Sequence, residues 1–380
     1  MQEENFVIID YATISKFFER KKMSFYVQEM IVRSCDLEFI SKLIAREDLC
    51  DRCMQMIVRT GNSELILELL DRDDLLGHTL EMIAQTQKRE YLLKLLEKRE
   101  LYGVAQRIIA EIGDEEYLSK LLTRDDLDSK AQKIIALTKK GEYISKLLDR
   151  SFLSNEAQEA IVEMRKRSYI IRLLKRDDLN EYAEAMIAYF KKSEYISLLL
   201  KRKYVGNRTQ LYLAKLDNHK YIPRLLERED LCEKVQVYIA KTDNNDFILK
   251  LLERDDLCDE AQEIIALLGE DEYIFKLLKR KDLSYCAQKI IAETGQDEFV
   301  VQLLERDDLW RYAQEVIWES EKPEFVSRLL ERNDLSIEMQ ILFAEKGNDE
   351  IVSKLLERDD LCDEAQRIIF ERAITKKVLE

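Results

Sequence analysis

The residues of this chain that could do chemistry are a Cys-x-x-Cys pair, two histidines and many carboxylates. Cys50 and Cys53 have the spacing of half a metal site or of a redox pair, and either role needs further ligands close by in sequence. The two histidines, His78 and His219, stand elsewhere in the chain. The sequence also contains no Gly-rich phosphate loop and no nucleophile motif. We therefore expect no catalytic residue, no metal and no cofactor, and the chain is predicted not to be an enzyme.

Arginine recurs with constant spacing, and this row organises the rest of the sequence. The spacing is 26 residues, and we call each member the turn arginine. The row stands at positions 20, 46, 72, 124, 150, 176, 202, 228, 254, 280, 306, 332 and 358, with Lys98 in the one remaining place. A fixed period of this length predicts stacked supersecondary units.

One repeat, around Arg254, has the pattern of two short helices. Phe247, Ile248 and Leu251 form a helical stripe before the arginine, and a second stripe follows within residues 259–267. Gly269 closes the repeat at a place suited to a left-handed helix end. Helices of about ten residues are marginal alone, so they need their neighbours. The predicted fold is all-α: an α-solenoid (superhelix) of about fourteen 26-residue two-helix repeats.

An aromatic residue occurs seven positions before the turn arginine in eleven of the repeats. These residues are Phe39, Tyr91, Tyr117, Tyr143, Tyr169, Tyr195, Tyr221, Phe247, Tyr273, Phe299 and Phe325. They share a helical stripe with leucines, so we expect them to pack in the core with hydroxyls at the rim, rather than to stack on bases.

The turn carries an acidic residue just before its leucine, as at Asp74, Asp126 and Asp360. A carboxylate there is expected to cap the second helix. The turn arginine, at the end of the first helix, is expected to reach an Asp of the next repeat.

Glutamine occurs eight residues after the turn arginine in eleven repeats, including Gln158, Gln210, Gln236 and Gln262. This position flanks the buried stripe of the second helix. The amides could bond to the neighbouring turn, or they could form a ladder offered to an extended peptide backbone. Both interpretations stay open at this point.

The repeat pattern also predicts the organisation of the chain. Residues 1–32 form a degenerate first repeat, with Thr13 in place of the aromatic, and are expected to be a capping repeat. Residues 33–371 are expected to form one continuous solenoid of regular repeats. Residues 372–380 depart from the pattern and are expected to be a C-terminal cap or a truncated end.

The middle of the chain differs from both flanks. Residues 164–224 contain fifteen Lys and Arg but six Asp and Glu, within a chain whose net charge is −15. Apolar residues also replace charged ones on the exposed face of the second helices here, as at Ala185 and Tyr189. Apolar residues ringed by basic ones suggest an interaction site. The predicted partner-binding residues are Tyr189, Lys201, Arg202, Lys203, Asn207, Arg208, Leu211, Lys215, Val237 and Lys241.

Composition narrows the possible partners. The acidic balance argues against nucleic acid as a whole-surface partner, since phosphate binding needs a basic footprint. No apolar run reaches the length of a membrane span, so no membrane partner is expected. The start of the chain lacks the basic residues of a secretion signal. Seven cysteines, an odd number, are most simply interpreted as reduced thiols in the cytoplasm.

Short two-helix units with a Leu-Leu pair, a polar turn and Ile-Ile-Ala resemble α-solenoid repeats. Residues 11–371 are most similar in texture to the leucine-rich repeat variant group and, more loosely, to the HEAT-like class. The repeat here is longer than the variant group's and far shorter than that of HEAT, and the iron–sulfur cysteine cluster of one variant protein has no match. The resemblance implies a scaffold that holds other proteins, although a few HEAT-like arrays bind DNA. The glutamine row is similar to the amide ladder by which armadillo arrays grip peptides.

Three functions follow as hypotheses. The first is a non-catalytic scaffold that binds a protein or peptide, either acidic or extended, on the concave surface at the basic middle repeats. The second is a nucleic-acid-binding solenoid that uses residues 164–224. The third is a self-assembling or spacer element, in which copies of the chain associate.

Overall fold

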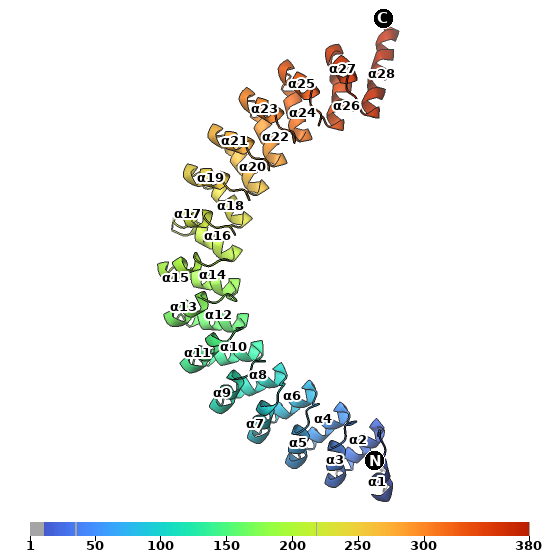
Figure 1. The fold of residues 1–380 in the computed structure, drawn as a ribbon, viewed down its shortest axis with the longest axis vertical. Coiled ribbons are helices and arrows are strands. Elements are labelled where there is room, and N and C mark those ends of the chain that lie inside the picture. The colour runs from blue at the N-terminus through green and yellow to red at the C-terminus, as the bar shows by residue number, and fades with distance from the viewer. Residues whose placement is uncertain (1–10, 35, 218, 380) are drawn as a thin grey trace, which may run out of the picture. The chain divides into compact units, whose positions relative to one another are not determined.

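The computed structural model describes residues 11–34, 36–217 and 219–379, with the backbone alone at 11–13 and 376–379. Within these residues the chain forms 28 helices and no strand. The predicted all-α repeat fold is therefore confirmed. The chain divides into two compact units, residues 1–199 and 200–380, each a stack of two-helix repeats (Figure 1). One continuous solenoid over residues 33–371 stays a prediction.

The first unit contains helices α1 to α15. Its first helices are α1 (Tyr11–Phe18), α3 (Leu37–Ile44), α5 (Ser63–Leu70), α7 (Arg89–Glu97), α9 (Glu115–Leu122), α11 (Gly141–Asp149), α13 (Arg167–Leu174) and α15 (Ser193–Leu199). Its second helices are α2 (Phe25–Arg33), α4 (Asp51–Arg59), α6 (Gly77–Gln85), α8 (Gly103–Ile112), α10 (Ser129–Leu137), α12 (Asn155–Glu163) and α14 (Glu181–Tyr189).

The second unit contains helices α16 to α28. Its first helices are α17 (Ile222–Leu226), α19 (Asn245–Leu252), α21 (Asp271–Leu278), α23 (Asp297–Leu304), α25 (Pro323–Leu330) and α27 (Asp349–Leu356). Its second helices are α16 (Asn207–Lys215), α18 (Glu233–Ala240), α20 (Asp259–Leu268), α22 (Tyr285–Glu293), α24 (Arg311–Glu319), α26 (Ile337–Lys346) and α28 (Asp363–Leu379).

Each unit has two layers of helices. First helices pack on first helices and second helices on second helices of adjacent repeats, and each second helix also packs on the following first helix. Within each unit the second helices lie on the inner side of the curve (Figure 1). The face that they expose is therefore the concave one of its unit.

The core consists of the predicted helical stripes. Of the eleven aromatic residues at the predicted position, ten are buried, and Phe247 is half-buried. Lysines cover the rims of several rings, as Lys166 does at 4.4 Å from the centre of Tyr169. The expectation of core packing is thus confirmed, because these ring faces are not exposed to stack on bases.

Short connectors join each second helix to the next first helix, and most of them turn through a left-handed residue. Gly269 (φ 72°) and Gly113 (φ 75°) take this conformation, as predicted for Gly269. Gln87 (φ 54°) and Lys139 (φ 58°) take the same conformation at the equivalent position. A side chain there costs free energy, since the left-handed region crowds the Cβ atom.

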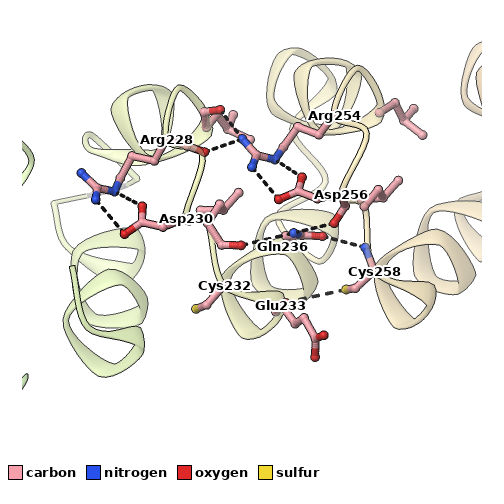
Figure 2. A network of polar contacts seen from close by, with 12 residues as sticks. Arg228, Asp230, Cys232, Glu233, Gln236, Arg254, Asp256 and Cys258 are labelled. Carbon is pink, nitrogen blue, oxygen red and sulfur yellow. Dashed lines mark hydrogen bonds and ion pairs between the residues drawn. The ribbon is translucent and has the colours of Figure 1, made fainter. Parts of the chain in front are cut away.

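The turn arginine links each turn to the turn before it (Figure 2). Arg254 donates from Nη1 to the carbonyls of Leu226 and Arg228, both at 2.8 Å, and grips Asp256 through Nε and Nη2, each at 2.8 Å. Ten turn arginines form an ion pair with the Asp two residues later, although Arg280 and Arg332 do so through Nη2 alone. The arginine therefore satisfies carbonyls left open by the end of the preceding first helix.

The predicted roles of the turn aspartate and arginine were wrong. The aspartate does not cap the second helix, whose N-cap lies two residues further on, at Cys258 in the repeat of Arg254. It pairs with the arginine of its own turn and can accept the amide of the preceding turn, as Asp230 does from Val205 at 2.9 Å. The arginine reaches backward to main-chain carbonyls, not forward to an Asp of the next repeat.

Glutamine completes the link from the second helix (Figure 2). Gln236 donates from Nε2 to the carbonyls of Leu231 (3.3 Å) and Asp256 (3.0 Å), and its Oε1 accepts from the Cys258 amide (2.7 Å). One buried amide thus holds its own turn and the next. We call the turn arginine, its aspartate and this glutamine together the turn clasp.

The two end repeats depart from the regular pattern. Arg46 bonds to the carbonyls of Phe18 and Arg20, so the first repeat is clasped like the others, although Tyr26 and Met30 are exposed on it. The side chain of Thr13 lies outside the described residues. At the other end, residues 372–379 continue α28 as a longer helix, on which Phe370 is exposed.

Substituting Gln158 by Ala is expected to destabilise the protein. The change leaves the Leu153 and Asp178 carbonyls and the Asn180 amide without their partner in a buried setting, at a cost of about 1–3 kcal/mol. Chemical denaturation measures this loss. The matched control is Gln85→Ala, at an exposed position of α6, where we expect a change within about 0.5 kcal/mol.

Replacing glycine by alanine and replacing a larger residue by glycine, both at the left-handed connector position, should change the stability of the protein in opposite directions. Gly269→Ala should destabilise by about 1 kcal/mol, because only the backbone conformation opposes the new Cβ atom and no heavy atom lies within 4 Å of it. Gln87→Gly should stabilise by a similar amount. Thermal melts of the two variants would contradict this account if both shifted in the same direction.

The turn aspartates predict a loss of stability in acid. The Arg46 guanidinium and the Met23 amide hold the pKa of Asp48 below its ordinary value. A carboxyl with a depressed folded-state pKa stabilises the fold at neutral pH, and this contribution is lost as pH falls below about 4. Asp48→Asn should lower stability at pH 7 and reduce the further loss in acid. Asp255→Asn, at an exposed turn position, is the control that should leave both unchanged.

Candidate functional site

Part of the predicted partner-binding set lies on two adjacent second helices of the second unit. On α16, Asn207, Leu211 and Lys215 follow one another at four-residue spacing, which places them on one face. Val237 and Lys241 occupy the same repeat positions on α18 and directly after it. The α16 and α18 faces are adjacent because the second helices of successive repeats pack on each other.

These faces border an open groove of about 760 Å³. Four of the ten predicted residues line it: Leu211, Lys215, Val237 and Lys241. The rest of the lining consists of Glu233, Lys234, Tyr238, Cys258, Asp259 and Glu260. Lys241 lies 3.9 Å from Glu260. The groove therefore has an apolar floor and equal numbers of basic and acidic residues around it.

Tyr189 belongs to the first unit and lines a different hollow. It is 53% exposed at the end of α14, where it borders about 420 Å³ together with Arg165, Phe190 and Lys192. Its predicted companion Ala185 is buried, only 3% exposed. The prediction of an exposed apolar residue at Ala185 was wrong, because a small side chain lets the neighbouring helices cover it.

The basic residues before α16 stand in the turn and not in the groove. Lys203 lies over the ring of Tyr204, at 5.2 Å from its centre. Arg202 is a turn arginine, and its carbonyl accepts from Arg228 at 3.0 Å. Arg208 is exposed in the first turn of α16 and does not line the groove. These residues were predicted as one site because they are close together in the sequence. The fold places some of them in a turn and others on a helix face.

The glutamines proposed as a peptide-binding ladder are internal. Gln158, Gln210, Gln236 and Gln262 are all buried, and each donates to the carbonyls of its own and the next turn. The bond to the neighbouring turn is the interpretation that the structure bears out. The prediction of a peptide-binding ladder was wrong, because these amides already bind main-chain groups away from the surface.

Burial disfavours the reactive thiolate form of Cys53 and Cys258. Burial and the Cys50 neighbour raise the pKa of Cys53 far above that of a free thiol. Burial also raises the pKa of Cys258, which borders the groove. Among the described residues no group of three or more His, Cys, Asp and Glu could hold a metal ion.

Six residues that line the groove were not predicted from the sequence, and Tyr238 is the aromatic one among them. Its hydroxyl lies 3.0 Å from Nε2 of His219, and the ammonium of Lys215 lies 5.5 Å from its ring centre. Its position on the second helix carries isoleucine in other repeats, as at Ile264, which belongs to the second helical stripe. The change from isoleucine to tyrosine, close to the basic segment, was the available signal.

Comparisons with known proteins add little to this description of the site. No family of known proteins and no curated protein matches the sequence. Among solved structures, the chain is similar to a crystal structure described as an engineered protein from the Northeast Structural Genomics Consortium. The two share 19% identity over 95% of this chain and 94% of that chain, with a TM-score of 0.16. A TM-score this low carries no argument.

No described helix combines the length and the apolar character needed to cross a lipid bilayer.

Proposed function

We propose that this protein is a non-catalytic interaction scaffold that binds a segment of another protein in the groove over α16, α18 and α20. We also propose that its repeats belong with the HEAT-like and leucine-rich repeat variant class. Each repeat consists of two short helices and a polar turn, and this pattern supports that placement. Fold alone does not carry function, so the proposal rests on the groove.

The observation that carries it is the meeting of Leu211 and Val237 in one open groove. The same position on other second helices holds charged residues, such as Lys133, Glu263 and Lys289. Two successive repeats depart from that pattern together, and both departures line the same hollow. Leu211 and Val237 are half-buried, and a partly exposed apolar floor with a charged rim is typical of a protein-binding surface.

The lining indicates the chemistry of the partner segment. Leu211, Val237 and the ring of Tyr238 can accept apolar side chains, while Lys215 and Glu233 represent the two signs of charge at the rim. We therefore propose a segment with apolar anchors flanked by both acidic and basic residues. A purely acidic segment fits this groove less well, because Asp259 and Glu260 would repel it.

The proposed setting is a reducing compartment, in keeping with the cytoplasm. Cys50, Cys53, Cys232, Cys258, Cys286 and Cys362 are all free thiols. Free thiols are the usual state of cysteine in such a compartment.

A photo-crosslinker in place of Leu211 tests the proposal. The partner that it captures is identified, purified and titrated against the wild-type chain and Leu211→Glu/Val237→Glu. We expect the double variant to bind at least about tenfold more weakly, because it buries charge against apolar anchors.

The matched control is Lys133→Ala/Glu159→Ala, which changes the same position in two successive repeats of the first unit. This control should bind as the wild type does. Equal affinity of the purified partner for the groove variant and the wild type would reject the groove as the binding site.

A further inference from the structure

Three successive connectors of the first unit carry a concentration of positive charge. They follow α10, α12 and α14. Together with the helix ends that border them, they carry seven basic residues against the acidic residues Glu142, Glu163 and Glu194. We call the seven the basic connector row: Lys139, Lys140, Arg165, Lys166, Arg167, Lys191 and Lys192. The row follows one edge of the stack, because the helices that the connectors join pack on one another.

Most of the equivalent connectors elsewhere are acidic, although residues 87–90, Gln-Lys-Arg-Glu, also carry two basic residues. Residues 113–116 read Gly-Asp-Glu-Glu, and residues 269–272 read Gly-Glu-Asp-Glu. Glycine at the left-handed position relieves backbone strain in those connectors. Lys139, Arg165 and Lys191 occupy that same position with φ between 53° and 58°. Among the described residues, a cation at the left-handed position is thus confined to three adjacent repeats of the first unit.

Most of these cations lack a carboxylate partner. Lys140 pairs with Glu115, and Arg167 pairs with Glu194 at 2.5 Å. The other five form no ion pair with any described residue. All seven are exposed. Their charge is therefore directed to solvent and is available to a ligand.

Two hollows bridge the connectors and keep the row continuous. One, of about 520 Å³, is lined by Lys139, Lys166 and the exposed Leu137, with Glu163 as its acidic residue. The next is the Tyr189 hollow, lined by Arg165 and Lys192. Each hollow thus takes cations from two successive repeats.

We propose that the basic connector row binds an acidic, extended peptide segment in which an acidic side chain recurs at every third residue. The site lies in the first unit and shares no residue with the groove over α16, α18 and α20. Its test is therefore independent of the scaffold proposal.

The repeat sets the spacing of the ligand. Lys139, Arg165 and Lys191 occupy one repeat position, and packed helices of successive repeats lie about 8–10 Å apart. A polyproline II segment has three residues per turn and rises about 3.1 Å per residue, so every third side chain points the same way at about 9.3 Å intervals. Carboxylates at that interval match one cation per repeat.

A single-stranded nucleic acid fits the same surface less well. Such strands bind by stacking bases on aromatic faces along a basic groove. Tyr169 and Tyr195 are buried here, and Lys166 and Lys192 cover their rings. The acidic connectors beyond the row would also repel a polyanion longer than three repeats.

Fluorescence anisotropy at low salt tests the proposal with a labelled peptide of four Glu-Pro-Pro triplets. We expect it to bind the wild-type chain, and to bind about tenfold more weakly to Lys139→Gln/Arg165→Gln/Lys191→Gln, since three surface charges are removed. Glutamine already occupies this position at Gln87 with positive φ, so the fold should persist. Circular dichroism checks that it does.

The controls separate spacing from charge. A peptide of the same composition with its glutamates contiguous should bind more weakly, and Lys250→Gln/Lys279→Gln/Lys281→Gln, in the second unit, should bind like the wild type. Equal binding of both peptides, or no effect of the connector variant, would overturn the proposal. It would also be overturned if an oligothymidylate bound more tightly than the spaced peptide and lost that affinity in the connector variant.

Discussion

The structure depends on the turn clasp between successive repeats. Helices of eight to ten residues cannot stand alone in water, and every helix end leaves main-chain groups that need partners. Arg254 and Gln236 supply those partners from adjacent repeats, and they do so with side chains whose reach is fixed. The period of 26 residues is therefore a geometric requirement: an inserted residue would remove both side chains from the carbonyls they bind.

Several repeats show what happens when a member of the clasp is absent. Met54 and Leu80 replace glutamine with buried apolar side chains, and there the Thr79 hydroxyl donates to the Asp51 carboxylate at 2.8 Å. At Arg150 the aspartate is replaced by Phe152, and the arginine binds the carbonyls of the preceding turn without a carboxylate. Glu184 places a buried carboxyl in the glutamine position. Packing of the apolar stripes holds these repeats in place, so the clasp sets register more than it sets total stability.

The sequence predicted the repeat, the burial of the aromatic residues and the left-handed end at Gly269, because each leaves a periodic signal. It did not predict the partners of Asp256, since a carboxylate before a helix fits two local geometries and only the neighbouring repeat decides between them. Burial at Ala185 depends on how closely two helices approach, and no residue type encodes that distance. The predicted set of ten residues was drawn from one stretch of chain, whereas the fold separates Tyr189, Lys203 and Leu211 into a hollow, a turn and a groove.

The burial of the glutamine row has a consequence for how such a chain can change over generations. The amides that hold the stack are enclosed, so the outward positions of the second helices take no part in these contacts. Substitutions there can accumulate with little penalty to folding. Chains with this internal architecture could thus come to bind unrelated partners while the buried contacts between repeats stayed the same.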